Sequence, residues 1–207
     1  MGFQLSINLI LIGGTCLVSW LAFNKPKLME RLILWPPAIE RDRQYERLLT
    51  YGFIHADFMH LLFNMITLYF FGGLIESVMI RLTGSIWTYP AFYLAAVAVS
   101  ILPSYFRNQK NPRYYSLGAS GAVSAVLFAY VLLAPWSMIL VFFIPVPAIL
   151  FAVFYVGYSI WMNHRGGDRI NHSAHLSGAA FGILFMVAMR PEILGHFWGM
   201  LLNPKFG

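Results

Sequence analysis

Five long stretches without a charged residue limit the fold of this chain more than any other feature. They cover positions 1–24, 58–75, 82–106, 114–164 and 170–189 of the 207 residues. A membrane-spanning helix needs about 20 consecutive, mostly apolar residues. The stretch 114–164 is long enough for two such helices, and prolines interrupt it near its middle. The pattern therefore predicts six spans.

We expect an all-α fold, a polytopic membrane bundle of six transmembrane helices that forms a single domain over residues 1–207. The composition agrees, because 59% of the residues are hydrophobic and only 11% are charged, whereas a soluble domain is about 25% charged. The apolar runs are solid rather than alternating, which disfavours a membrane β-barrel. The expected spans are 4–23, 56–79, 86–106, 117–134, 146–163 and 171–190.

The basic residues indicate contact with lipid rather than with nucleic acid. The formal net charge is +6, and the lysines and arginines are scattered over the loops between spans. The loops after spans one, three and five carry eleven of them, and the opposite side carries three. The positive-inside rule therefore favours termini outside. No Lys or Arg precedes the first span, and no small-residue cleavage site follows it, so we expect a retained helix rather than a signal peptide.

Several polar residues stand where the apolar spans begin. His60 lies near the start of span two, and Asn64 follows one helical turn later, on the same face. Ser120 lies at the start of span four, and His172 and His175 at the start of span six. Polar groups inside a membrane are costly, so each one is a candidate functional residue.

Each of these features also has an ordinary structural explanation. Serine among small residues is typical of helix packing, as is the glycine spacing at 178–182. The combination indicates chemistry, because contact between spans four and six would let Ser120 pass its proton to His175. His60 and Asn64 would then supply hydrogen bonds to an oxyanion.

A set of motifs follows one order along the chain. The motifs are Arg47, His55-x4-His60-x3-Asn64, Gly72-Gly73-x2-Glu76, Gly118-Ala119-Ser120-Gly121 and Ala174-His175-x2-Gly178-x3-Gly182. In this order and at these spacings, the sequence resembles the rhomboid intramembrane serine proteases. The resemblance runs from about residue 47 to residue 182, most of the chain.

The resemblance implies a role for each matching residue. Ser120 would be the nucleophile and His175 the general base, acting as a dyad. His60, Asn64 and the backbone N–H of Ser120 would form the oxyanion hole. The remaining matches would be structural. Arg47 would hold loop one, and Glu76 the end of span two; each loop takes the number of the span that it follows. Gly118 and Gly121 would flank the nucleophile, and Gly178 would allow spans four and six to pack closely.

The resemblance also implies a substrate and a setting. The expected function is a serine endopeptidase that cleaves transmembrane helices of other membrane proteins, in a water-filled depression below the membrane surface. The expected partners are those substrates and membrane lipids, without nucleic acid, cofactor or metal. The expected location is a bacterial inner membrane. The sequence does not predict the oligomeric state.

Three features depart from the family pattern. Many rhomboids have a tyrosine four residues after the nucleophile that stacks on the catalytic histidine, and here that position is Ser124. A tryptophan often precedes the loop-one arginine, and here the residue is Glu46. The family places both termini in the cytosol, whereas the Lys and Arg count favours the reverse.

Three alternatives come from other classes of function. The first is a catalytically inactive, rhomboid-like membrane binder, although such relatives usually lose the serine or the histidine. The second is a zinc enzyme built on His172 and His175 with His55 and His60, although the H-E-x-x-H pattern is absent. A transporter would show related halves with paired broken spans, and no such repeat is visible.

Overall fold

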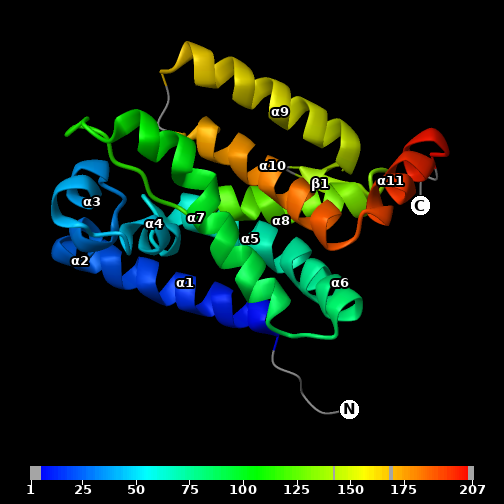
Figure 1. Ribbon diagram of the computed structural model, residues 1–207, viewed down its shortest axis with the longest axis horizontal. Helices are drawn as coiled ribbons and strands as arrows, with labels where there is room; N and C mark the ends of the chain where they lie inside the picture. Colours follow the sequence, from blue (N-terminus) through cyan, green and yellow to red (C-terminus); the bar gives the residue numbers. More distant parts are fainter. Residues whose placement is uncertain (1–5, 142, 168–169, 205–207) are drawn as a thin grey trace.

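The computed structural model of the protein describes residues 6–141, 143–167 and 170–204. Within these ranges the chain folds into helices and one short antiparallel hairpin (Figure 1). The elements are α1 (Ile7–Asn24), α2 (Pro26–Leu32), α3 (Pro36–Asp42), α4 (Arg47–Thr50), the 3₁₀ turn η1 (Tyr51–Phe53), α5 (Phe58–Thr67), the π-helical segment η2 (Leu68–Gly72), α6 (Gly73–Thr83), α7 (Thr88–Asn108), α8 (Ser120–Leu133), β1 (Met138–Val141), β2 (Ile144–Pro147), α9 (Ala148–Arg165), α10 (His172–Met189) and α11 (Glu192–Leu202).

A helix stands at each of the six predicted spans, but not every one is long and apolar enough to cross a membrane alone. Among the described residues, four qualify: α1, the continuous rod Phe58–Thr83 formed by α5, η2 and α6, α7, and α10. Helix α8 has 14 residues, or about 21 Å at 1.5 Å per residue, against a hydrocarbon core of about 30 Å. The fold is therefore a helical membrane bundle, and six crossings remain a prediction. Residues 4 and 5, where the first predicted span begins, lie outside the described ranges.

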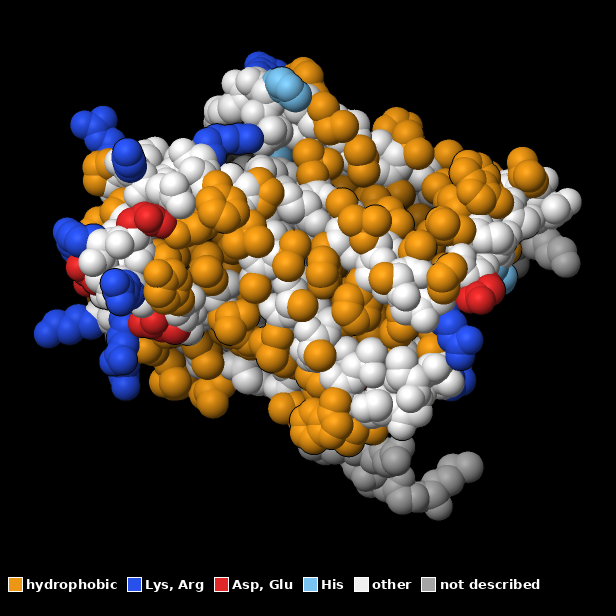
Figure 2. All heavy atoms as spheres, in the orientation of Figure 1, with side chains coloured by type: hydrophobic (Ala, Val, Ile, Leu, Met, Phe, Trp, Pro, Cys, Tyr) orange, Lys and Arg blue, Asp and Glu red, His pale blue; other side chains and the backbone are white. Residues whose placement is uncertain are grey.

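The surface has the distribution of charge that a membrane protein requires. Figure 2 shows a broad apolar area, with most Lys and Arg side chains gathered at the end that carries α2 and α3. Helix α1 turns its polar residues inward, since Asn8, Thr15 and Ser19 are buried while Leu17 and Trp20 are exposed. Apolar side chains facing outward suit a lipid environment.

Helix α8 lies inside the bundle and carries Ser120 at its first position. Nearly all of its residues are buried, as expected of a helix that is apolar all round. Small residues bring it against α10, because a β carbon added to Gly178 would lie 2.0 Å from the Gly121 carbonyl oxygen. A β carbon on Gly182 would lie 2.1 Å from the Ala125 carbonyl oxygen. The two backbones therefore touch, which brings the first turns of α8 and α10 together.

Glu76 ties the rod Phe58–Thr83 to α1. Its buried carboxylate accepts hydrogen bonds from the Ser6 hydroxyl and from the backbone N–H groups of Ile7 and Asn8. These N–H groups lie at the helix start, where they lack partners within the helix and where a negative charge is favourable. Glu76 therefore caps α1 from another helix.

The π-helical segment η2 has its own contact with α1. The Asn8 side chain donates to the Leu68 carbonyl at 2.9 Å and accepts from the Tyr89 hydroxyl at 2.6 Å. A β carbon on Gly72 would lie 2.1 Å from the Asn8 Oδ1 atom. The wider turn and the glycine thus give room for one buried amide between three helices.

Loop one folds into short helices that support the loop before α8. Buried Arg47 donates to the Gln44 side chain at 2.6 Å and to the backbone carbonyls of Glu30 and Ile33 at 2.8 and 2.6 Å. The chain beside these helices is then bonded to loop three, since Leu34 and Ser116 exchange two backbone hydrogen bonds. Loop one therefore positions the segment that leads to Ser120.

The segment between α8 and α9 carries no charged residue. It forms a hairpin in which Met138 pairs with Pro147 and Val141 with Ile144. The following helix begins at Ala148, two residues after the predicted start at 146. The hairpin lies at the opposite end of α8 from Ser120, and it therefore takes no part in the candidate site.

Candidate active site

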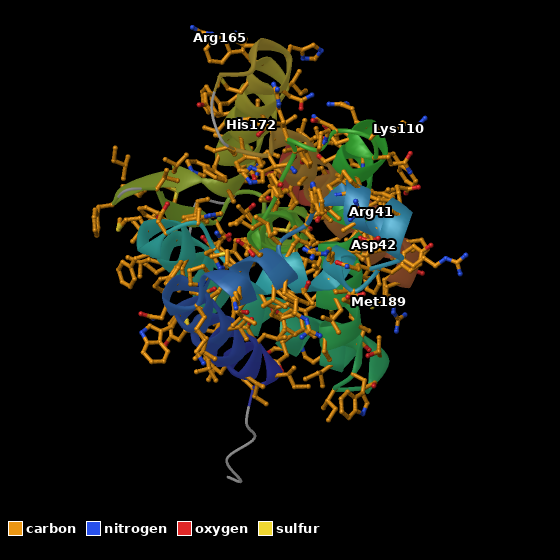
Figure 3. The ribbon with its side chains drawn as sticks, turned by 90° about the vertical axis from the view of Figure 1, so that its left-hand side faces the viewer. Arg41, Asp42, Lys110, Arg165, His172 and Met189 are labelled. Atoms are coloured by element: carbon orange, nitrogen blue, oxygen red, sulfur yellow. The ribbon has the colours of Figure 1, made fainter. Side chains whose placement is uncertain are left out.

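One cavity of about 1230 Å³ contains the residues that the sequence predicts to act together. Ser120, His175, His60 and Asn64 all line it, as do Gly118 and Gly121. They come from α5, from loop three, and from the first turns of α8 and α10. Figure 3 views the molecule from its charged end, with His172 nearer the middle than Lys110 and Arg165.

Gly118 shapes the approach to Ser120. Its φ of +117° is a conformation that L side chains rarely adopt, and an added β carbon would lie 2.6 Å from the His60 ring. The N–H of Gly118 donates to the Tyr51 carbonyl at 2.9 Å. The loop therefore runs directly against His60 before α8 begins at Ser120.

His55 holds the residue that precedes Ser120. Its Nε2 atom accepts from the Ala119 N–H at 3.3 Å, and its Nδ1 atom lies 2.9 Å from the Ser19 hydroxyl. Since Nε2 accepts, Nδ1 carries the proton and donates to Ser19. Burial, with a smaller effect of nearby His60, lowers the pKa of His55 to about 3. His55 is therefore a neutral support for the loop, a role that the sequence did not assign.

His60 and Asn64 lie on successive turns of α5. The Asp57 side chain caps this helix by accepting from the His60 N–H at 2.8 Å. The Asn64 amide donates to the His60 carbonyl at 2.8 Å, which fixes its orientation. An amide group carries two N–H donors, so Asn64 is able to donate again toward the cavity.

Asn171 fixes the start of the helix that carries His175. Its Oδ1 atom accepts from the Ala174 N–H at 3.0 Å and from the Ser104 hydroxyl at 2.9 Å. Its Nδ2 atom donates to the Tyr114 hydroxyl at 2.9 Å and to the Ser116 hydroxyl at 3.1 Å. One side chain thus caps α10 and joins it to α7 and loop three, a role that the sequence analysis missed.

The ring stacked on His175 comes from α9. The rings of Tyr155 and His175 lie 5.8 Å apart with an interplanar angle of 19°. At the position where many rhomboids have tyrosine, the Ser124 hydroxyl lies 2.6 Å from the Tyr155 hydroxyl. No motif in the sequence marks Tyr155, because it lies 31 residues after Ser124 and on another helix.

The metal alternative finds no ligand set in the described part of the chain. Residues 6–141, 143–167 and 170–204 contain no group of three or more His, Cys, Asp and Glu side chains placed to hold a metal ion. His172 and His175 instead pack edge to face, with ring centroids 5.9 Å apart.

Comparison with known proteins identifies the family. The Rhomboid domain model matches residues 42–192, a range that includes every residue of the candidate site. The chain is 31% identical to "RHOMBOID-like protein 12, mitochondrial" of Arabidopsis thaliana over 89% of this chain and 58% of the relative. It is 26% identical to "Rhomboid protease GlpG" of Haemophilus influenzae over 74% of each protein.

A yeast relative, "Rhomboid protein 1, mitochondrial" of Saccharomyces cerevisiae, is 30% identical over 65% of this chain and 39% of its own length. The chain therefore spans about two fifths to three fifths of its mitochondrial relatives in plant and yeast. The family model covers most of the chain and all of the cavity's predicted residues. This protein is a multi-pass membrane protein and belongs to the rhomboid family.

Proposed function

We propose that this chain is an intramembrane serine endopeptidase that uses Ser120 and His175 as a dyad. One observation carries the proposal: a hydroxyl, an imidazole and two donor side chains from three helices line one cavity. The family includes a relative named as a protease, which supports the same reaction. Arg47 and Glu76 would have structural roles, consistent with their hydrogen bonds to loop one and to α1.

In the proposed reaction, His175 takes the proton of the Ser120 hydroxyl while the Ser120 oxygen attacks the carbonyl carbon of the scissile peptide. The Ser120 N–H, His60 and Asn64 stabilise the negative charge that develops on the carbonyl oxygen. His175 then protonates the leaving amine as the C–N bond breaks, which leaves an ester on Ser120. Water, deprotonated by His175, hydrolyses the ester and regenerates the serine.

The proposed substrate is a transmembrane segment of another protein. A helix in a membrane keeps its peptide groups in internal hydrogen bonds, so the segment has to unwind before Ser120 reaches a carbonyl carbon. The cavity offers polar residues from loop three and loop five beside apolar ones from α5 and α9, which suits a partly unwound strand and water. Membrane lipids are the other expected partners.

The named relatives bear on which membrane contains the protein. Both named mitochondrial relatives, from plant and yeast, are matched over most of this chain, so the bacterial inner membrane expected from the sequence gains no support. Most Lys and Arg side chains in Figure 2 gather at the end that carries α2 and α3, and Arg107 and Arg113 line the cavity itself.

A fluorescent fluorophosphonate tests for an activated serine in the purified protein. We expect labelling of the wild type and none of Ser120→Ala or His175→Ala, together with cleavage of a transmembrane reporter in liposomes by the wild type alone. A folded wild type that neither reacts nor cleaves, yet retains the reporter, would instead establish the inactive membrane binder.

A further inference from the structure

Two tyrosines of α9 pack against two histidines of α10 in matching register. Tyr155 stacks on His175 at 5.8 Å, and Tyr158 meets His172 edge to face at 5.6 Å. Each pair of residues is three apart on its helix, so each occupies one face. The later tyrosine meets the earlier histidine, as antiparallel neighbours require. The contact is therefore a repeated aromatic interface rather than one chance approach.

Hydrogen bonds connect Tyr155, through Ser124, to Ser120. The Ser124 hydroxyl donates to the Ser120 carbonyl at 2.8 Å and lies 2.6 Å from the Tyr155 hydroxyl. A serine hydroxyl has one proton, and Ser124 uses it on Ser120. Tyr155 is therefore the donor to Ser124, and its ring is fixed at one edge by this bond and across its face by His175.

Tyr155 lies on a helix that contributes neither member of the dyad. Helix α9 lies along the outside of the bundle beside α10 (Figure 1), and Phe151, one turn before Tyr155, lines the cavity with it. The Tyr155 side chain is uncharged at neutral pH, so it acts on His175 through the position of its ring rather than through charge. The place of α9 then determines where the imidazole plane points.

We propose that Tyr155 is the positioning residue of this site. Its stacked ring orients the imidazole of His175. Its hydroxyl, hydrogen-bonded to Ser124, fixes the position of that ring relative to Ser120. The proposal rests on the proposed function, since it assigns a means of orienting the base of the same dyad. Ser124, which stands where many rhomboids have tyrosine, then helps to hold Tyr155 in place. A larger side chain at position 124 would occupy the place of the Tyr155 hydroxyl.

The test compares variants of the full chain in liposomes, with kcat and KM for a transmembrane reporter and the rate of fluorophosphonate labelling per folded molecule. Tyr155→Leu removes the ring, and we expect kcat and the labelling rate to fall together by about 10²-fold, as for a misplaced catalytic group, with KM within about twofold. Tyr155→Phe keeps the ring and should restore most of the rate. Ser124→Ala keeps the Tyr155 ring but removes the hydrogen-bond partner of the Tyr155 hydroxyl. Its kcat and labelling rate should match those of Tyr155→Phe.

Phe154→Leu is the matched control, because Phe154 is the adjacent aromatic residue of α9 and is 74% exposed. We expect it to keep wild-type rates. Wild-type kcat and labelling in Tyr155→Leu would overturn the positioning role and leave the proposed function intact. If Tyr155→Leu fails to fold, a fall in kcat of about 10²-fold in folded Tyr155→Phe, which keeps the stacked ring, would overturn it. A wild type without labelling or cleavage would overturn both proposals.

Discussion

Gly178 of α10 lies against the backbone of Gly121 of α8, so that a β carbon on Gly178 would stand 2.0 Å from the Gly121 carbonyl oxygen. Real β carbons do not approach an oxygen so closely, and the obstacle is backbone, which does not rotate away. The contact sets the separation of the two helices that carry Ser120 and His175. It therefore links membrane helix packing directly to the proposed dyad.

Gly178→Ala is expected to separate these helices and to lower the free energy of unfolding by at least about 2 kcal/mol, as for overpacking of a tight core. Fluorophosphonate labelling of Ser120 should fall with it. The control is Gly157→Ala in α9, where a β carbon would meet nothing within 4 Å. Thermal unfolding in detergent measures both, and equal midpoints for the two variants would contradict the explanation.

Asn64→Ala is expected to lower kcat by about 10²–10³-fold if the amide is a full oxyanion donor. KM should change little, because the charge that the amide stabilises exists only in the transition state. Kinetics with the transmembrane reporter separate the two quantities. An unchanged kcat would mean that the Ser120 N–H and His60 suffice.

Acid is expected to destabilise the protein through His55. Its folded-state pKa of about 3 lies below the ordinary value of 6.5, so the unfolded chain binds the proton first. This stability is complete above about pH 6.5 and declines as the pH falls toward 3. By pH 5.5 the loss amounts to about 1–2 kcal/mol.

Thermal unfolding at pH 7.5, 6.5 and 5.5 checks this, with His55→Gln as the comparison. The variant should be less stable at pH 7.5, because it lacks the ring between Ala119 and Ser19, but should lose less on acidification. Parallel curves for the two proteins would assign the acid sensitivity to other groups.

Glu76→Ala is expected to destabilise the bundle by about 1–3 kcal/mol, because it leaves buried donors at the start of α1 without their acceptor. Glu76→Gln keeps one acceptor oxygen and should cost less. Since Glu76 lies outside the cavity residues, labelling per folded Ser120 should stay at the wild-type rate in both. A loss of labelling without a loss of stability would place Glu76 in the chemistry.

Much of the bundle follows from the sequence because membrane helices are mainly a local property. An uncharged apolar run has to satisfy its own peptide groups in lipid, so the stretches 58–75 and 82–106 identify helices without knowledge of their neighbours. The same reasoning gave a span for 117–134, although α8 itself has 14 residues. Residue composition gives the helix but not its depth in the membrane.

Some residues of the candidate site could be predicted from the sequence, and others could be found only in the structure. His60 and Asn64 share a face because they are four apart on one helix, and Gly178 indicates close packing by its size alone. That His60 and Asn64 meet Ser120 and His175 in one cavity is an expectation from the resemblance to the rhomboid proteases, because spacing along the chain does not place separate helices side by side. Asn171, His55 and Tyr155 gave no comparable signal, since their partners Ser104, Ala119 and His175 are brought to them by the fold.

The sequence by itself determined the helical membrane class, because apolar runs fix it, and the family, because motifs in one fixed order carry the resemblance; those motifs include four residues of the cavity, Ser120, His175, His60 and Asn64. Only the tertiary structure decided that a tyrosine of α9, rather than the residue at 124, stacks on His175. A stacked ring requires only a face at the right distance, and several helices can provide one. Which helix does so depends on how the whole bundle packs.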